Sequence, residues 1–79
     1  MMPEYQEPIS QRELQQEALQ HLKEHGPLNW NALYIRFDAQ SQGRIGTALL
    51  DLEVGGFIEP LHNLHQITAS GIQKLRSGM

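Results

Sequence analysis

The residues from Ser41 to Leu75 constrain the fold more than any other part of this 79-residue chain. Apolar residues recur there at the spacing of one helix face, at Ile45, Ala48, Leu49 and Leu52. This spacing predicts an amphipathic helix over residues 42–54, with Ser41 as its N-cap and Gly56 at its C-terminal end. Residues 38–40 are the predicted turn before that helix.

A short β-hairpin and a last helix are predicted after the Gly-Gly pair. Residues 57–61 and 64–67 favour two short strands, and because only His62 and Asn63 separate them, the hairpin is tight. Thr68 then has the place of an N-cap for a helix over residues 69–75.

Two further helices are predicted in the first half of the chain. Ser10 and Glu13 have the spacing of a capping box, and the helix that they open ends at Gly26, which proline follows. A second helix is predicted from Asn29, as its cap, to about Phe37. The chain is therefore expected to be mainly α with a small β-hairpin, in the order helix, helix, helix, strand, strand, helix.

The chain length predicts a single small domain, which we place at residues 10–76. Residues 1–9 contain two prolines and no periodicity, so we expect a flexible N-terminal arm there, with residues 77–79 as a tail. No apolar run approaches the roughly 20 residues that span a bilayer, and the N-terminus has no apolar signal-peptide core. We expect a cytoplasmic protein without membrane contact.

The formal net charge of −3 is unevenly distributed along the chain. The acidic excess lies in residues 1–40, whereas residues 41–79 carry equal numbers of basic and acidic side chains. We therefore expect any DNA affinity to rest on few phosphate contacts. The sequence has no cysteine, no phosphate-binding glycine loop and no nucleophile motif, so we predict neither an enzyme nor a cofactor.

Two motifs in the second half of the chain are similar to those of known regulators. Residues 49–59, LLDLEVGGFIE, follow the form Leu-x-x-Leu-Glu-x-x-Gly-Leu-Ile-Glu, and residues 67–75, ITASGIQKL, follow Leu-Thr-x-x-Gly-x-x-x-Leu. At these residues the chain resembles bacterial winged-helix regulators of the MarR and PadR type. Residues 49–61 also resemble the C-terminal winged domain of the DNA-processing protein DprA. The resemblance covers roughly residues 10–76.

The resemblance implies a winged helix-turn-helix domain that binds double-stranded DNA and regulates transcription. Helix 42–54 would be the recognition helix, whose N-terminal end enters the major groove, and hairpin 57–67 a short wing. Arg44 could bind guanine or phosphate, and Thr47 could contact a base edge or a thymine methyl group. The candidate DNA contacts are Arg36, Gln40, Ser41, Gln42, Arg44, Thr47, His62 and Asn63.

Leu50 and Val54 support a different function. They lie one turn apart on the helix face that should be polar, which indicates burial against something else. The N-terminal arm, the wing, a second copy of the chain or another protein could cover them. The alternative is therefore a protein-interaction module, or a homodimer, on a winged-helix scaffold.

The histidines form a weaker pattern. His21 and His25 are four residues apart on one helix face, a spacing that can bind a metal ion, and His62 and His65 could complete the set. Helix-end and hairpin histidines are usually surface residues, and the sequence shows no accompanying carboxylate cluster or cysteine. We therefore predict no metal site.

Overall fold

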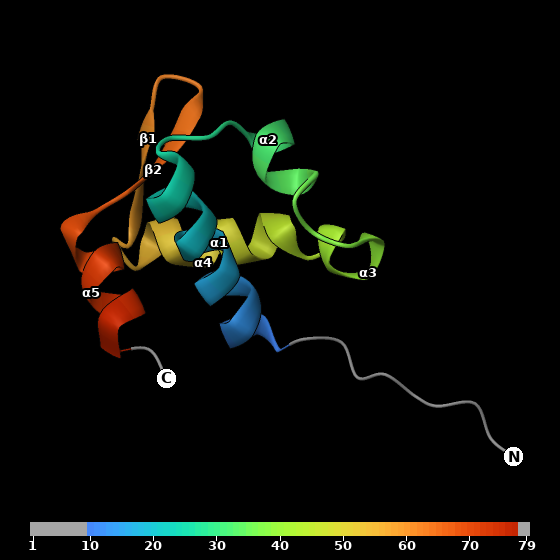
Figure 1. The fold of residues 1–79 in the computed structure, drawn as a ribbon, viewed down its shortest axis with the longest axis horizontal. Coiled ribbons are helices and arrows are strands. Elements are labelled where there is room, and N and C mark those ends of the chain that lie inside the picture. The colour runs from blue at the N-terminus through green and yellow to red at the C-terminus, as the bar shows by residue number, and fades with distance from the viewer. Residues whose placement is uncertain (1–9, 78–79) are drawn as a thin grey trace, which may run out of the picture.

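The computed structural model describes residues 10–77, so the predicted arm at residues 1–9 and the last two tail residues lie outside the described residues. Four helices precede an antiparallel hairpin, and a fifth helix follows it (Figure 1). The elements are α1 (Gln11–His25), α2 (Trp30–Tyr34), α3 (Ala39–Gln42), α4 (Ile45–Val54), β1 (Ile58–Leu61), β2 (Leu64–Ile67) and α5 (Ala69–Ser77). This arrangement confirms a mainly helical α+β domain with a hairpin near its C-terminal end.

Helix α1 begins and ends at the predicted residues. The Ser10 hydroxyl accepts a hydrogen bond from the Glu13 backbone amide at 3.1 Å, which satisfies one of the unpaired amides of the first turn. Gly26 ends the helix with a φ of 78°, and its amide donates to the Leu22 carbonyl at 2.9 Å. The glycine permits a left-handed backbone that other residues adopt at a cost.

Helix α2 begins as predicted but is shorter. The Asn29 side chain accepts a hydrogen bond from the Ala32 amide at 2.8 Å, and the helix then ends at Tyr34 rather than near Phe37. Beyond Ile35 the backbone bonds join residues three apart, from Arg36 to Leu33 at 3.0 Å and from Phe37 to Tyr34 at 3.2 Å. This tighter winding still places Phe37 in the core beside Leu33.

The predicted turn at residues 38–40 is wrong, because it lies largely within the short helix α3. The Asp38 carboxylate accepts from the Ser41 amide at 2.8 Å and so caps a helical turn that begins three residues before the predicted helix. Gly43 and Arg44 then interrupt the winding, and α4 begins at Ile45 without a side-chain cap. The predicted helix over residues 42–54 is therefore two helices joined by a short turn.

The C-terminal end of α4 is closed by a pair of backbone hydrogen bonds. The Phe57 amide donates to the Leu52 carbonyl at 2.9 Å, and the Gly56 amide donates to the Glu53 carbonyl at 3.0 Å. This pairing is the Schellman motif, whose left-handed residue is Gly56 with a φ of 81°. The motif reverses the direction of the chain, so that β1 begins at Ile58, soon after α4 ends at Val54.

The hairpin has the predicted two-residue turn. Its second strand, β2, is also hydrogen-bonded to the segment that follows α1. Leu61 pairs with Leu64 across His62 and Asn63. On the outer side of β2, the His65 amide donates to the Leu28 carbonyl at 2.7 Å, and the Leu28 amide donates back at 3.1 Å. These bonds add a one-residue third strand that the sequence pattern did not indicate.

Helix α5 is fastened to the junction between α4 and β1. The Thr68 hydroxyl accepts from the Gly71 amide at 3.1 Å and donates to the Gly56 carbonyl at 2.7 Å, so the predicted cap also makes a tertiary bond. A Cβ atom on Gly71 would clash with the Phe57 carbonyl oxygen, so only glycine permits this close approach. The helix extends to Ser77, two residues beyond the predicted end.

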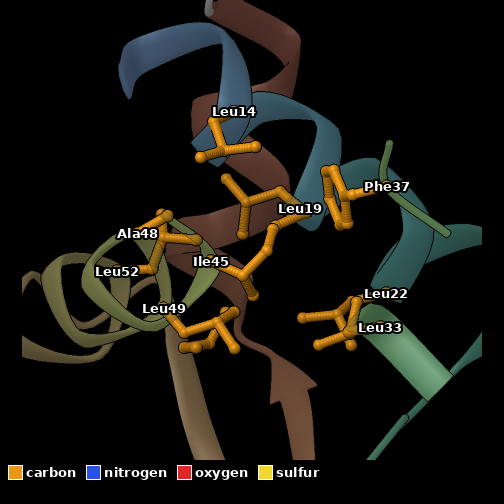
Figure 2. Packing of buried hydrophobic residues seen from close by; sticks show 11 residues of the cluster. Leu14, Leu19, Leu22, Leu33, Phe37, Ile45, Ala48, Leu49 and Leu52 are labelled. Atoms are coloured by element: carbon orange, nitrogen blue, oxygen red, sulfur yellow. The ribbon is translucent and has the colours of Figure 1, made fainter. Parts of the chain in front are cut away.

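The core lies where α1 crosses α4. Figure 2 shows Leu14 and Leu19 of α1 facing Ile45, Ala48 and Leu52 of α4. Leu33 of α2 and Phe37 after it cover one side of this core, and Ile58 of β1 completes the cluster. Full burial of one such side chain stabilises the fold by about 1.5–3 kcal/mol. The predicted inward residues of α4 are confirmed, and the opposite face of α4 is exposed to solvent.

Candidate functional site

Helix α4 has one buried face and one exposed face. Thr47, Leu50 and Val54 lie on the face opposite the core residues. Leu50 exposes 61% of its surface and Val54 exposes 80%. Leu50 and Val54 lie one turn apart, so their exposed side chains are neighbours on this face.

The first half of α4 and the segment before it contain most of the predicted DNA contacts. Gln40 and Thr47 are exposed, as is Arg36 just after α2. A Cβ atom placed on Gly43 would meet nothing within 4 Å, so the space in front of this backbone is open. Gly43 lies between α3 and α4, so this opening is at the turn before α4.

Ser41 is buried, which contradicts its predicted place on the DNA-facing surface. The residue lies within α3 and exposes 5% of its surface. Because Asp38 caps the helical turn in its place, Ser41 sits one turn further along and points into the domain. Its side chain is therefore excluded from the candidate contacts.

Two other candidates make hydrogen bonds within the fold. The Gln42 side-chain amide donates to the Tyr34 carbonyl at 3.1 Å, and the half-buried Arg44 donates through Nη2 to Gln11 Oε1 at 3.1 Å. These bonds hold the junction of α3 and α4 against α2 and the start of α1. A contact between Gln42 or Arg44 and an external ligand has to share or replace them.

The hairpin tip is separate from this region. His62 and Asn63 are exposed at the turn, and His62 has a left-handed φ of 57°. In Figure 1 the tip of the hairpin and α3 lie at well-separated positions, because the hairpin rises from the opposite end of α4. The structure thus brings Gln40, Gln42 and Arg44 together and leaves the two tip residues as a second location.

The second half of α4 bears an apolar surface that α2 extends. A Cβ atom on Gly46 would lie 3.5 Å from Cη2 of Trp30, so the indole ring lies over Gly46. Leu50 and Val54 follow Gly46 at successive turns of the helix. We call the row of Trp30, Leu50 and Val54 the apolar strip; the Trp30 ring is itself 40% exposed.

The contact between Trp30 and α4 was not predicted from the sequence. Trp30 also lies beside Tyr34, four residues later, with the two ring centroids 6.0 Å apart. The missing signal was Gly46, which lies four residues before Leu50 and leaves room for a large ring.

Two carboxylates border the apolar strip. With 3.6 residues per turn, Asp51 and Glu53 fall on opposite sides of the line from Leu50 to Val54. Both residues are exposed, and Asp51 accepts a hydrogen bond of 3.4 Å from the Gln15 side chain of α1. The second half of α4 is therefore an apolar row between two acidic groups.

Helix α1 carries a group of possible metal ligands at its C-terminal end. Ligand atoms of His21, Glu24 and His25 all lie within 4.8 Å of one another. Burial, and then the charge of Arg36, hold the pKa of His21 below its usual value, which favours the neutral imidazole that binds metal ions. The sequence interpretation overlooked Glu24, although it lies three residues after His21.

This group does not extend to the hairpin histidines. Among residues 10–77, His62 and His65 do not belong to it. Three neighbouring side chains on one helix end can bind an ion such as zinc only with an open coordination shell. No second element of the described chain adds a ligand, so the fold itself does not build a closed site.

Comparison with known proteins does not assign a family. No protein-family model, curated protein or solved structure matches this chain. The resemblance to winged-helix regulators therefore remains a prediction from the sequence motifs. None of the helices within residues 10–77 has both the length and the apolar character needed to cross a membrane.

Proposed function

We propose that this domain is a winged-helix module that binds double-stranded DNA through the first half of α4. The observation that carries the proposal is the exposure of Gln40 and Thr47 on either side of Gly43, beside which the space is open. The helix precedes a tight hairpin, which is the order that winged helices use to present a recognition helix. The missing side chain at Gly43 would let a base edge or a phosphate approach the backbone, whereas at Gly46 the Trp30 ring already lies against it.

The side chains near this opening can supply the contacts of a weak binder. Thr47 offers a hydroxyl group and a methyl group to base edges, and Gln40 offers an amide. Arg36 offers a positive charge to a phosphate from the end of α2. Arg44 contributes once its bond to Gln11 is shared or exchanged. His62 and Asn63 supply a separate contact at the hairpin tip.

The small number of positive groups predicts a modest, weakly salt-dependent affinity. The logarithm of the binding constant falls by about 0.9 per phosphate contact for each tenfold rise in salt. Arg36 and Arg44 provide two such contacts, whereas dedicated DNA-binding proteins make several more. The acidic residues on the second half of α4 would weaken binding if the duplex extended over them.

Fluorescence anisotropy with a labelled DNA duplex at low salt tests the proposal. We expect Thr47→Ala and Arg36→Ala each to weaken binding, with only Arg36→Ala also lowering the salt dependence. Arg76→Ala is the control, because it removes an exposed positive charge from α5 instead. The proposal fails if wild type does not bind, or if the control variant weakens binding as much as the other two.

A further inference from the structure

We infer that the second half of α4 is a docking surface for a basic amphipathic helix of another protein. The surface consists of the apolar strip, formed by Trp30, Leu50 and Val54, together with Asp51 and Glu53. It lies beyond the residues assigned to DNA above. The inference rests on different side chains, so it can hold or fail independently of DNA binding.

The shape of the strip suits a helix. Gly46, Leu50 and Val54 follow one another at four-residue intervals, which is the ridge that packs between the ridges of a second helix. Eight residues of helix rise by about 12 Å, so the row matches two turns of a partner. The Trp30 ring covers Gly46, so the open part of the row is Leu50 and Val54, with the indole at one end of it. A partner helix with apolar residues at four-residue spacing fits this row.

The charges around the strip select a basic partner. Asp51 and Glu53 lie on either side of Leu50 and Val54 and are both exposed. Lysine or arginine residues that flank the apolar face of the partner would meet one carboxylate on each side. Complementary charges at the rim of an interface raise the association rate and reject partners of the wrong charge.

The same carboxylates disfavour a second copy of this chain as the occupant. In a symmetric dimer across this face, two α4 helices would pair through Leu50 and Val54. Asp51 and Glu53 of each copy would then lie beside those of the other, and like charges at an interface oppose binding. DNA phosphates are repelled for the same reason, which leaves a basic helix as the matching ligand.

The single tryptophan makes the test direct, because Trp30 is part of the proposed surface. The full chain is titrated with a synthetic peptide that carries leucines at four-residue spacing and lysines around them. One control peptide has glutamate in place of lysine, and another has the same composition with the leucines out of register. Trp30 fluorescence reports binding to all three, and the basic amphipathic peptide is expected to bind about tenfold more tightly than either control.

Variants of the protein locate the binding site. Leu50→Ser and Val54→Ser each weaken binding of the basic peptide by about tenfold, as loss of a central apolar contact does. Ile35→Ser is the matched control, because Ile35 is 73% exposed but lies outside the strip. Asp51→Asn and Glu53→Gln weaken binding severalfold at low salt and less at high salt. Circular dichroism melting confirms that each variant is folded.

Three results would overturn the inference. Equal binding of the lysine and glutamate peptides would show that charge does not select the partner. Binding that Ile35→Ser weakens as much as Leu50→Ser would place the site elsewhere. Self-association of the wild type in sedimentation equilibrium, abolished by Leu50→Asp, would show that a second copy occupies the strip.

Discussion

The two halves of α4 share one rigid helix and one exposed face, yet they differ in chemistry. The first half carries the exposed Thr47 and follows the open space beside Gly43, and Arg36 and Arg44 lie nearby. The second half combines Leu50 and Val54 with two carboxylates and the Trp30 ring. Because both halves rest on the same core, a difference in what they bind arises from surface side chains. We therefore propose nucleic acid and a protein partner as ligands of different parts of one helix.

The largest expected effect is on the stability of the domain, and it comes from a substitution in the core that supports both halves of α4. Leu52→Ala empties a fully buried position of α4 and should lower the free energy of unfolding by about 2–5 kcal/mol. Leu50→Ala, two residues earlier on the exposed face, should change it by less than about 0.5 kcal/mol. Urea denaturation of both variants makes the comparison. Similar losses of unfolding free energy in the two variants would mean that Leu50 packs against the domain in solution.

A smaller effect, on binding affinity, should distinguish the ligands proposed for the two halves of α4. Thr47→Glu places a negative charge where the DNA backbone approaches, and should weaken duplex binding by about tenfold. It should not weaken binding of the basic peptide, because an added negative charge beside the strip attracts a basic partner as Asp51 and Glu53 do. Leu50→Ser should do the reverse. Anisotropy and Trp30 fluorescence measure the two affinities on the same protein samples, and parallel losses in both assays would merge the halves into one site.

The smallest effect concerns α3, which supports only the first half of α4. Hydrogen bonds from Ser41 lower the pKa of Asp38 from its ordinary value of 3.8. The ionised form is thus favoured in the folded state, so its stabilisation is complete above pH 3.8 and is lost as the pH falls through the lowered folded value.

Asp38→Asn is the matched variant for this effect, because asparagine also caps helices but does not titrate. Thermal melts should show wild type above the variant in midpoint at neutral pH, with the gap closing in acid below pH 3.8. A gap that is constant with pH would mean that the charge of Asp38 does not contribute to the cap.

Local signals in the sequence were enough for most of the element boundaries. Ser10, Asn29 and Thr68 cap their helices as predicted, because each bond joins residues three apart and depends on nearby chain alone. The tight turn at residues 62–63 is local for the same reason. The inward face of α4 also followed from periodicity, since burial of one helix face repeats at the helical period.

The errors arose where two residues competed for one role or where distant segments met. Asp38 and Ser41 are both favourable caps, and their spacing lets one cap a turn that contains the other. Periodicity does not decide between them, so α3 and the burial of Ser41 were missed. The contact between Trp30 and Gly46 depends on how α2 packs on α4, and no pattern along the chain reports that packing.

The paired hydrogen bonds between Leu28 and His65 have a consequence for how the domain opens. They close a loop that contains α2, α3, α4 and β1. Closing such a long loop has an entropic cost, which is offset only when the whole segment is folded. Fraying of the hairpin and release of the helices are thus coupled across the middle of the chain. In hydrogen exchange, the Leu28 and His65 amides should lose protection together, as parts of one cooperative unit.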